Sequence, residues 1–112
     1  MRRRGILLAS AVFFCLVSCV ASAQGKTQNN GAAVFKTQCV MCHGATGKGD
    51  TQTGNTLNAM DFHDPEVMQM SDADLATIIG KGKNMMPAFG KRLSTIDIDD
   101  LISYIHLLQK TK

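Results

Sequence analysis

The stretch Cys39-Val40-Met41-Cys42-His43 determines how the rest of this chain is interpreted. It has the pattern C-x-x-C-H, which is the attachment site of a c-type haem. The spacing suits this chemistry because two thiols one helical turn apart can each form a thioether to one vinyl group of a single porphyrin. The adjacent imidazole then lies beneath the iron and supplies one axial nitrogen. The motif therefore predicts one covalent haem c, anchored by Cys39 and Cys42 and ligated by His43.

Two other kinds of site use paired cysteines, and neither fits this sequence. A thioredoxin-like redox pair sits near a βαβ pattern, whereas nothing in this chain alternates like a strand. A zinc site needs four protein ligands, and neither a second cysteine pair nor a His-x₃₋₅-His follows the motif. We expect no structural disulfide, because the other two cysteines, Cys15 and Cys19, lie in the N-terminal segment.

Residues 1–23 have the features of a signal peptide. Three arginines precede an almost wholly apolar run over 6–20, and an Ala-Ser-Ala cleavage pattern ends at Ala23. We expect cleavage after Ala23. The alternatives are lipidation of Cys19, which ends a lipobox-like Leu-Val-Ser-Cys, and an uncleaved anchor, although the run is short for a span of roughly 20 residues. Each alternative exports the domain, so we expect a periplasmic protein, tethered to the membrane as a lipoprotein if Cys19 carries lipid.

The remainder of the chain is expected to form one small domain. Residues 24–30 are polar and lack periodicity, which indicates a flexible linker, and residues 31–112 are assigned to the domain. The net charge of +3 comes entirely from the three arginines of the export signal, because nine basic residues balance nine acidic ones after it. The basic isoelectric point therefore gives no support for nucleic-acid binding. Since so short a domain has a modest core, we expect the haem-free chain to be poorly folded.

The fold class predicted from the helical patterns is all-α, with three main helices packed around the haem. The first helix opens at Gly31, carries Phe35 on the same face as the motif cysteines, and ends at Gly44. The stretch 45–58 is rich in Gly, Thr and Asn and is expected to be a loop.

Two later segments are predicted as helices from their capping residues and apolar spacing. Ser71 begins one, with Asp74 as a capping-box partner, and glycines at 80 and 82 end it. Ser94 or Thr95 caps the last helix, in which apolar residues recur at helical spacing. These residues are Ile98, Leu101, Ile102, Ile105 and Leu108.

The second axial ligand determines whether the iron is closed to substrates. Most methionines only fill cores, but Met86 precedes Pro87, which holds it out of the helical region, in a glycine-bounded loop. We therefore predict Met86 as the second axial ligand. Met85 is the first alternative, and either His63 or His106 would give bis-histidine ligation.

With these residues in place, the sequence resembles the class I, His/Met-ligated cytochromes c of the small soluble bacterial and algal type. The resemblance covers residues 31–108. It implies that Cys39 and Cys42 anchor the haem and that His43 and Met86 are the axial ligands. The matching residues are Gly31, Phe35, 39–44, 47–49, 81–90, Leu93, Ser94, Ile98, Leu101, Tyr104 and Ile105.

The resemblance also implies how the first and last helices meet. Gly31 and Phe35 are expected to pack against Leu101 and Tyr104 where the two helices cross at near right angles, because glycine lets the backbones approach closely. One departure concerns the histidine ligand. The family usually has a proline, whose carbonyl accepts a hydrogen bond from that histidine, where this chain has Thr56.

The resemblance implies a monomeric one-electron carrier between membrane or periplasmic redox partner proteins, not an enzyme. No general base, nucleophile or open metal site is evident in the sequence. The alternatives are a haem c subunit of an oxidase or dehydrogenase complex, a small haem peroxidase and a ligand sensor, of which the last two need an open iron position. Five basic residues near the haem-binding stretches are either ordinary solvated surface or a rim that docks an acidic partner. These residues are Lys48, Lys81, Lys83, Lys91 and Arg92.

Overall fold

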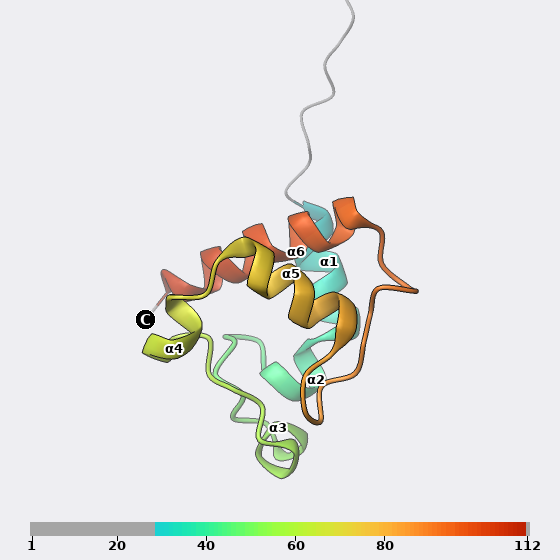
Figure 1. The fold of residues 1–112 in the computed structure, drawn as a ribbon. Coiled ribbons are helices and arrows are strands. Elements are labelled where there is room, and N and C mark those ends of the chain that lie inside the picture. The colour runs from blue at the N-terminus through green and yellow to red at the C-terminus, as the bar shows by residue number, and fades with distance from the viewer. Residues whose placement is uncertain (1–28, 112) are drawn as a thin grey trace, which may run out of the picture.

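The structure is a computed structural model that describes residues 29–111. The expected signal peptide, its cleavage after Ala23 or lipidation at Cys19, and the linker up to residue 28 lie outside the described residues. This part of the chain contains six helices, labelled in Figure 1, and α1, α5 and α6 are the three longest, which confirms the predicted all-α class. The helices are α1 (Asn29–Gln38), α2 (Val40–His43), α3 (Gln52–Leu57), α4 (Pro65–Met68), α5 (Asp72–Lys81) and α6 (Thr95–Gln109).

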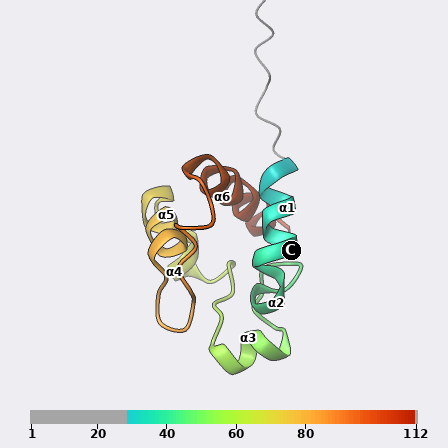
Figure 2. The same cartoon turned by 90° about the vertical axis from the view of Figure 1, so that its right-hand side faces the viewer.

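Helix α1 crosses α6 closely, as the resemblance to class I cytochromes c implied. A Cβ atom at Gly31 would overlap the backbone carbonyl of Asp100 and crowd the amide of Leu101, so only glycine allows this approach. Phe35 is buried, and its ring centroid lies 5.4 Å from that of Tyr104. The expected packing at the crossing is confirmed. In Figure 2, α6 lies above, with α5 on one side and the α1–α2 pair on the other.

The start of α1 differs from the prediction by two residues. The helix begins at Asn29, so the last two residues of the expected linker, 24–30, are helical. The side-chain amide of Asn30 donates a hydrogen bond of 2.5 Å to Asp97 at the beginning of α6. This contact between residues far apart in sequence anchors the additional residues, and nothing in the local composition indicates it.

Capping boxes begin both α5 and α6, as predicted. The Ser71 hydroxyl accepts from the amide of Asp74 at 3.2 Å, and the Asp74 carboxylate accepts from the amide of Ser71 at 3.1 Å. The corresponding distances for Ser94 and Asp97 are 3.1 and 2.9 Å, so Ser94 is the cap of the last helix. Hydrogen bonds from the serine side chains hold the pKa values of Asp74 and Asp97 below the usual range.

Two expected boundaries are wrong. The stretch 45–58, predicted as a loop, contains α3, because the Thr51 hydroxyl accepts from the amide of Gly54 at 2.8 Å and so caps a helix. Gly80 does not end α5 but lies inside it, and Gly82, with φ of 77°, is the residue after its last turn.

The buried apolar side chains form one cluster that joins α1, α5 and α6. Tight burial of α6 on this cluster explains why its apolar residues recur at helical spacing. None of the helices within residues 29–111 has the length and apolarity needed to cross a membrane. The cluster consists of Phe35, Phe62, Val67, Leu75, Ile79, Phe89, Ile98, Leu101, Ile102, Ile105 and Leu108.

Candidate haem site

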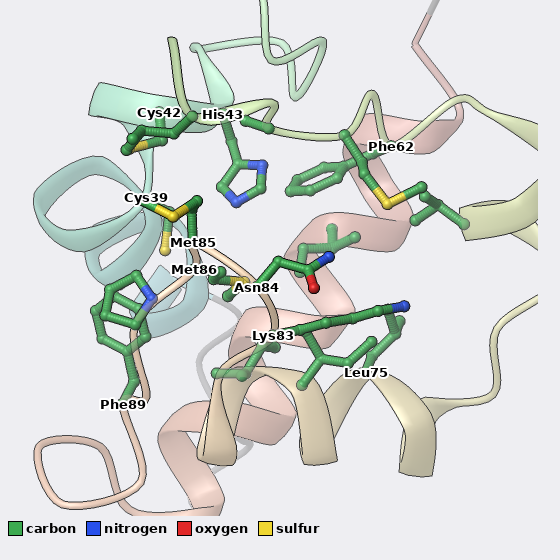
Figure 3. Close-up of a pocket in the computed structure, with 18 of the residues that line it drawn as sticks. Cys39, Cys42, His43, Phe62, Leu75, Lys83, Asn84, Met85, Met86 and Phe89 are labelled. Atoms are coloured by element: carbon green, nitrogen blue, oxygen red, sulfur yellow. The ribbon is translucent and has the colours of Figure 1, made fainter. Parts of the chain in front are cut away.

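A cavity of about 190 Å³ brings the predicted site residues together. Cys39, Cys42 and His43 line it from the end of α1 and from α2, and Met86 lines it from the loop after α5. Figure 3 shows the His43 ring extending into this space, with the loop that carries Met86 facing it. Most of the remaining wall is apolar, and its members include Phe35, Leu57, Phe62, Val67, Leu75, Ile79, Phe89, Leu101 and Ile105.

The C-x-x-C-H motif forms a short helix of its own. The expected helix from Gly31 to Gly44 is divided at Cys39, whose φ of −119° departs from helical geometry. The amide of Cys39 still donates to the carbonyl of Phe35 at 2.9 Å, and the amide of His43 donates to the carbonyl of Cys39 at 2.9 Å. These bonds attach α2 to the end of α1 and orient the motif so that Cys39, Cys42 and His43 line the cavity.

Both motif cysteines are half-buried, and no disulfide joins them. Burial raises the pKa of the Cys39 thiol to about 11, and the neighbouring Cys42 adds to this effect. The Cys39 thiol is therefore protonated at neutral pH. Within residues 29–111, no group of three or more His, Cys, Asp or Glu side chains is arranged to hold a metal ion, so nothing there favours the zinc alternative.

The surroundings of His43 favour the neutral imidazole, which is the form that ligates a metal through nitrogen. Burial lowers its pKa, and the backbone of Met60 opposes this only in part. Its Nδ1 atom is buried and makes no hydrogen bond of normal geometry with the described residues. The ring is instead flanked by the buried ring of Phe62, whose centroid lies 4.7 Å away at an interplanar angle of 32°.

The backbone group that affects His43 belongs to Met60. Thr56, which stands where the family usually has a proline, lies in α3, where its hydroxyl donates to the carbonyl of Gln52 at 3.0 Å. Sequence reasoning also missed Phe62, because a single aromatic residue within a polar stretch carries no periodic signal.

A tight reversal presents Met86 to the cavity. The backbones of Lys83 and Met86 exchange two hydrogen bonds, of 2.9 and 3.2 Å, across Asn84, whose φ of 54° lies in the left-handed region. Met86 is half-buried and packs against the apolar cluster, whereas the side chain of Met85 is 63% exposed. Although both methionines line the cavity, this difference in burial favours Met86 as the one that faces the interior.

The two histidines considered as alternative ligands lie elsewhere. Neither His63 nor His106 lines the cavity. His63 contacts Asp61 and the end of α6, and His106 contacts the carboxylate of Asp72 at 2.7 Å and the side chain of Gln109 at 2.9 Å. Both ring nitrogens of each histidine are engaged, so bis-histidine ligation has no support.

The five basic residues proposed as a rim are all exposed. Lys83 itself lines the cavity, and the guanidinium of Arg92 lies 4.7 Å from the ring centroid of Phe89, which also lines it. Positive charge is thus present at the cavity on the side of the loop that carries Met86.

Comparison with known proteins agrees with this geometry. The family model described as "Cytochrome C oxidase, cbb3-type, subunit III" matches residues 26–105. Cytochrome c6 of Gloeothece citriformis is 36% identical over 103 residues, which cover 88% of this chain and 90% of that protein. Cytochrome c6 of Porphyra purpurea is 33% identical over 106 residues, which cover 94% of this chain and 93% of that protein.

A larger relative and a solved structure extend the comparison. The cbb3-type cytochrome c oxidase subunit FixP of Azorhizobium caulinodans is 37% identical over 83 residues, which cover 70% of this chain but 26% of that protein. The solved structure of the KustC0563 c-type cytochrome superposes with a TM-score of 0.65 and 28% identity, covering 71% of this chain and 98% of that one. The chain therefore belongs to the class I c-type cytochromes, small electron carriers that hold a single covalent haem c.

Proposed function

We propose that the chain is a freestanding, exported one-electron carrier rather than an enzyme, with His43 and Met86 as the two axial ligands. The observation that carries this proposal is the meeting of four side chains on one apolar cavity: Cys39 and Cys42 beside His43, with Met86 contributed by a separate segment. Two thiols, an imidazole and a thioether form a complete set for one covalent haem whose iron has no free position.

The bound haem supplies an iron that alternates between the ferric and ferrous states. Cys39 and Cys42 would anchor it by thioethers, and His43 and Met86 would remain in place in both states. The apolar wall excludes water and disfavours the additional positive charge of the ferric form, which together with the thioether ligand raises the reduction potential. With Met86 packed against the core, no position is left for a substrate, which argues against the peroxidase and sensor alternatives.

The redox partners of this carrier are proposed to approach the cavity on its basic side. Exposed Lys83 and exposed Met85 lie together at the cavity lining, and the other four basic residues are also exposed. An acidic partner surface would be attracted to this side, which mainly increases the association rate and makes it dependent on salt. The monomeric state, the periplasmic location and the cleavage after Ala23 are parts of the same proposal, with lipidation of Cys19 as the alternative.

A second candidate is a haem c subunit of an oxidase complex. Two observations favour it: the description of the matched family model and the 37% identity to a cbb3-type oxidase subunit. The protein purified from its source would distinguish the two. A carrier sediments alone, whereas a subunit sediments with a larger complex, and the intact mass of the same sample reports the cleavage site, any lipid and the number of covalent haems.

The proposed carrier function is tested by a redox titration of the purified holoprotein, followed by carbon monoxide. We expect a single one-electron transition and no binding of carbon monoxide to the ferrous protein at neutral pH, because both axial positions are filled. Carbon monoxide binding to the native ferrous protein would instead indicate an open site and favour an enzyme or a sensor.

A further inference from the structure

His63 is surrounded by hydrogen-bond acceptors at both of its ring nitrogens. Its Nδ1 lies 2.6 Å from the Asp61 carboxylate, and its Nε2 lies 3.0 Å from each of the backbone carbonyl oxygens of Leu108 and Thr111. Carboxylate and carbonyl oxygens can only accept, and a neutral imidazole has a single N–H. One nitrogen lone pair of a neutral His63 would therefore face an oxygen lone pair. Only the imidazolium, with two N–H groups, satisfies all three contacts.

The electrostatic surroundings support the charged form. The hydrogen bond with Asp61 raises the pKa of His63 above its ordinary value. Desolvation opposes this increase in part, and the Leu108 and Thr111 carbonyls add smaller increases. Hydrogen bonds from the backbone and side chain of His63 lower the pKa of the Asp61 carboxyl, and the charge of Lys48 adds a smaller decrease. A cation at the C-terminal end of α6 is also stabilised by the helix dipole. We call the three contacts of His63 the His63 clasp.

The clasp is adjacent in sequence to Phe62, the ring that flanks His43. The Phe62 amide donates to the carbonyl of Gly47 at 2.8 Å, and the Phe62 carbonyl accepts from the Gln109 side chain at 3.1 Å. A Cβ atom at Gly47 would crowd the Phe62 ring, which shows how closely the ring is enclosed. The segment 61–63 is thus fastened to the end of α6 at two points, through Gln109 and through the clasp. Gln109 also contacts His106, the other titratable group near this end of the helix.

We propose that His63 is a positioning residue for the His43 imidazole: as an imidazolium it fastens the segment 61–63 to the end of α6 and so holds Phe62 against His43. The proposal deepens the assignment of His43 as an axial ligand and rests on it. When His63 loses a proton, the Nδ1–H to Asp61 is the shorter bond and is retained, so Nε2 is left without a proton opposite two carbonyl oxygens. The clasp then opens, and Phe62 is held less firmly.

The sign of the pH dependence follows from the direction of the shift. The pKa of His63 is higher in the folded protein than in the unfolded chain, where it is near 6.5. The clasp is therefore fully formed below that value and is lost as the pH rises through the higher folded value. The reduction potential is expected to fall over the same range. Loss of a nearby positive charge stabilises the ferric form relative to the ferrous form, and His43 is less firmly oriented.

The test compares four variants of the holoprotein with the wild type between about pH 5 and pH 9. Two quantities are measured: the protection of the Phe62 amide from hydrogen exchange, corrected for intrinsic pH dependence, and the reduction potential. In the wild type, protection is expected to drop about tenfold as His63 deprotonates, and the potential to fall with it. His63→Gln is expected to lose both steps. Asp61→Asn should move both steps to lower pH, which keeps the test valid if His63→Gln does not fold.

Two control variants separate His63 from its neighbours. Asp64→Asn removes an exposed carboxylate next to the segment 61–63. The Asp64 side chain makes no capping bond, so both steps should stay where they are. His106→Gln should likewise leave the midpoint of both steps unchanged. The proposal is overturned if His63→Gln retains either step, if Asp61→Asn does not move them, or if wild-type Phe62 protection is independent of pH. Because exchange at Phe62 does not depend on which residue ligates iron, a failed clasp is distinguishable from a wrong ligand, which His43→Ala would reveal in the absorption spectrum.

Discussion

Replacing Gly31 by alanine tests the crossing of α1 and α6 on which the fold depends. A Cβ atom at this position would lie well inside 3.0 Å of the Asp100 carbonyl, a separation that real Cβ atoms essentially never show. The obstacle is backbone, which cannot rotate away as a side chain can, so the two helices must separate. Overpacking of this kind costs about 1–3 kcal/mol, and the intrinsic preference of alanine for helix returns at most about 1 kcal/mol. Together, these two effects give an expected net loss of about 1–2 kcal/mol.

Gly80 offers a matched control in the same molecule. It also lies inside a helix, α5, but a Cβ atom there would meet nothing within 4 Å. Gly80→Ala should therefore leave stability unchanged or raise it by up to about 1 kcal/mol. Urea unfolding of the holoproteins, followed by far-ultraviolet circular dichroism, measures both changes. A Gly31→Ala protein as stable as the wild type would refute the close crossing.

Three further predictions concern the cap of α3, the capping carboxylates of α5 and α6, and folding without haem. Thr51→Val removes the hydroxyl that caps α3 and donates to the carbonyl of Met41 at 2.7 Å, so it should lower stability by about 1–2 kcal/mol in thermal unfolding, while Thr51→Ser should restore most of the loss. The pKa values of Asp74 and Asp97 are lower in the folded protein than in the unfolded chain, where they are near 3.8. The ionised carboxylates therefore stabilise the fold above that pH, and this stability is lost as the pH falls. Acid titration of Asp97→Asn should show a smaller loss of stability than the wild type. Expression without haem-attachment machinery should give a chain with little helical circular dichroism.

Local chemistry explains which features could be predicted from the sequence. The haem motif is a contiguous pattern whose spacing follows from the porphyrin. The starts of α5 and α6 follow from Ser-x-x-Asp, in which both partners lie within one turn. Met86 could be distinguished from Met85 because Pro87 restricts the residue immediately before it, and the difference in burial between the two side chains agrees with that choice.

The features that escaped prediction depend on contacts between distant residues. Helix α3 is anchored by Thr51 on the carbonyl of Met41, and the first turn of α1 by Asn30 on Asp97. The local composition around His63, a short polar stretch, indicates a solvated side chain, yet its ring lies on the end of α6. No periodicity or short motif encodes such pairings, because the two partners come together only when the helices pack.

The central claim, that Met86 completes the iron site opposite His43, is tested most directly by the absorption spectrum of the oxidised holoprotein. The long-wavelength band that reports an iron–thioether bond is measured for the wild type, Met86→Ala and the neighbouring control Met85→Ala. We expect the band in the wild type and in Met85→Ala, whose side chain is 63% exposed, and its loss in Met86→Ala. A band that survives in Met86→Ala and disappears in Met85→Ala would contradict the account.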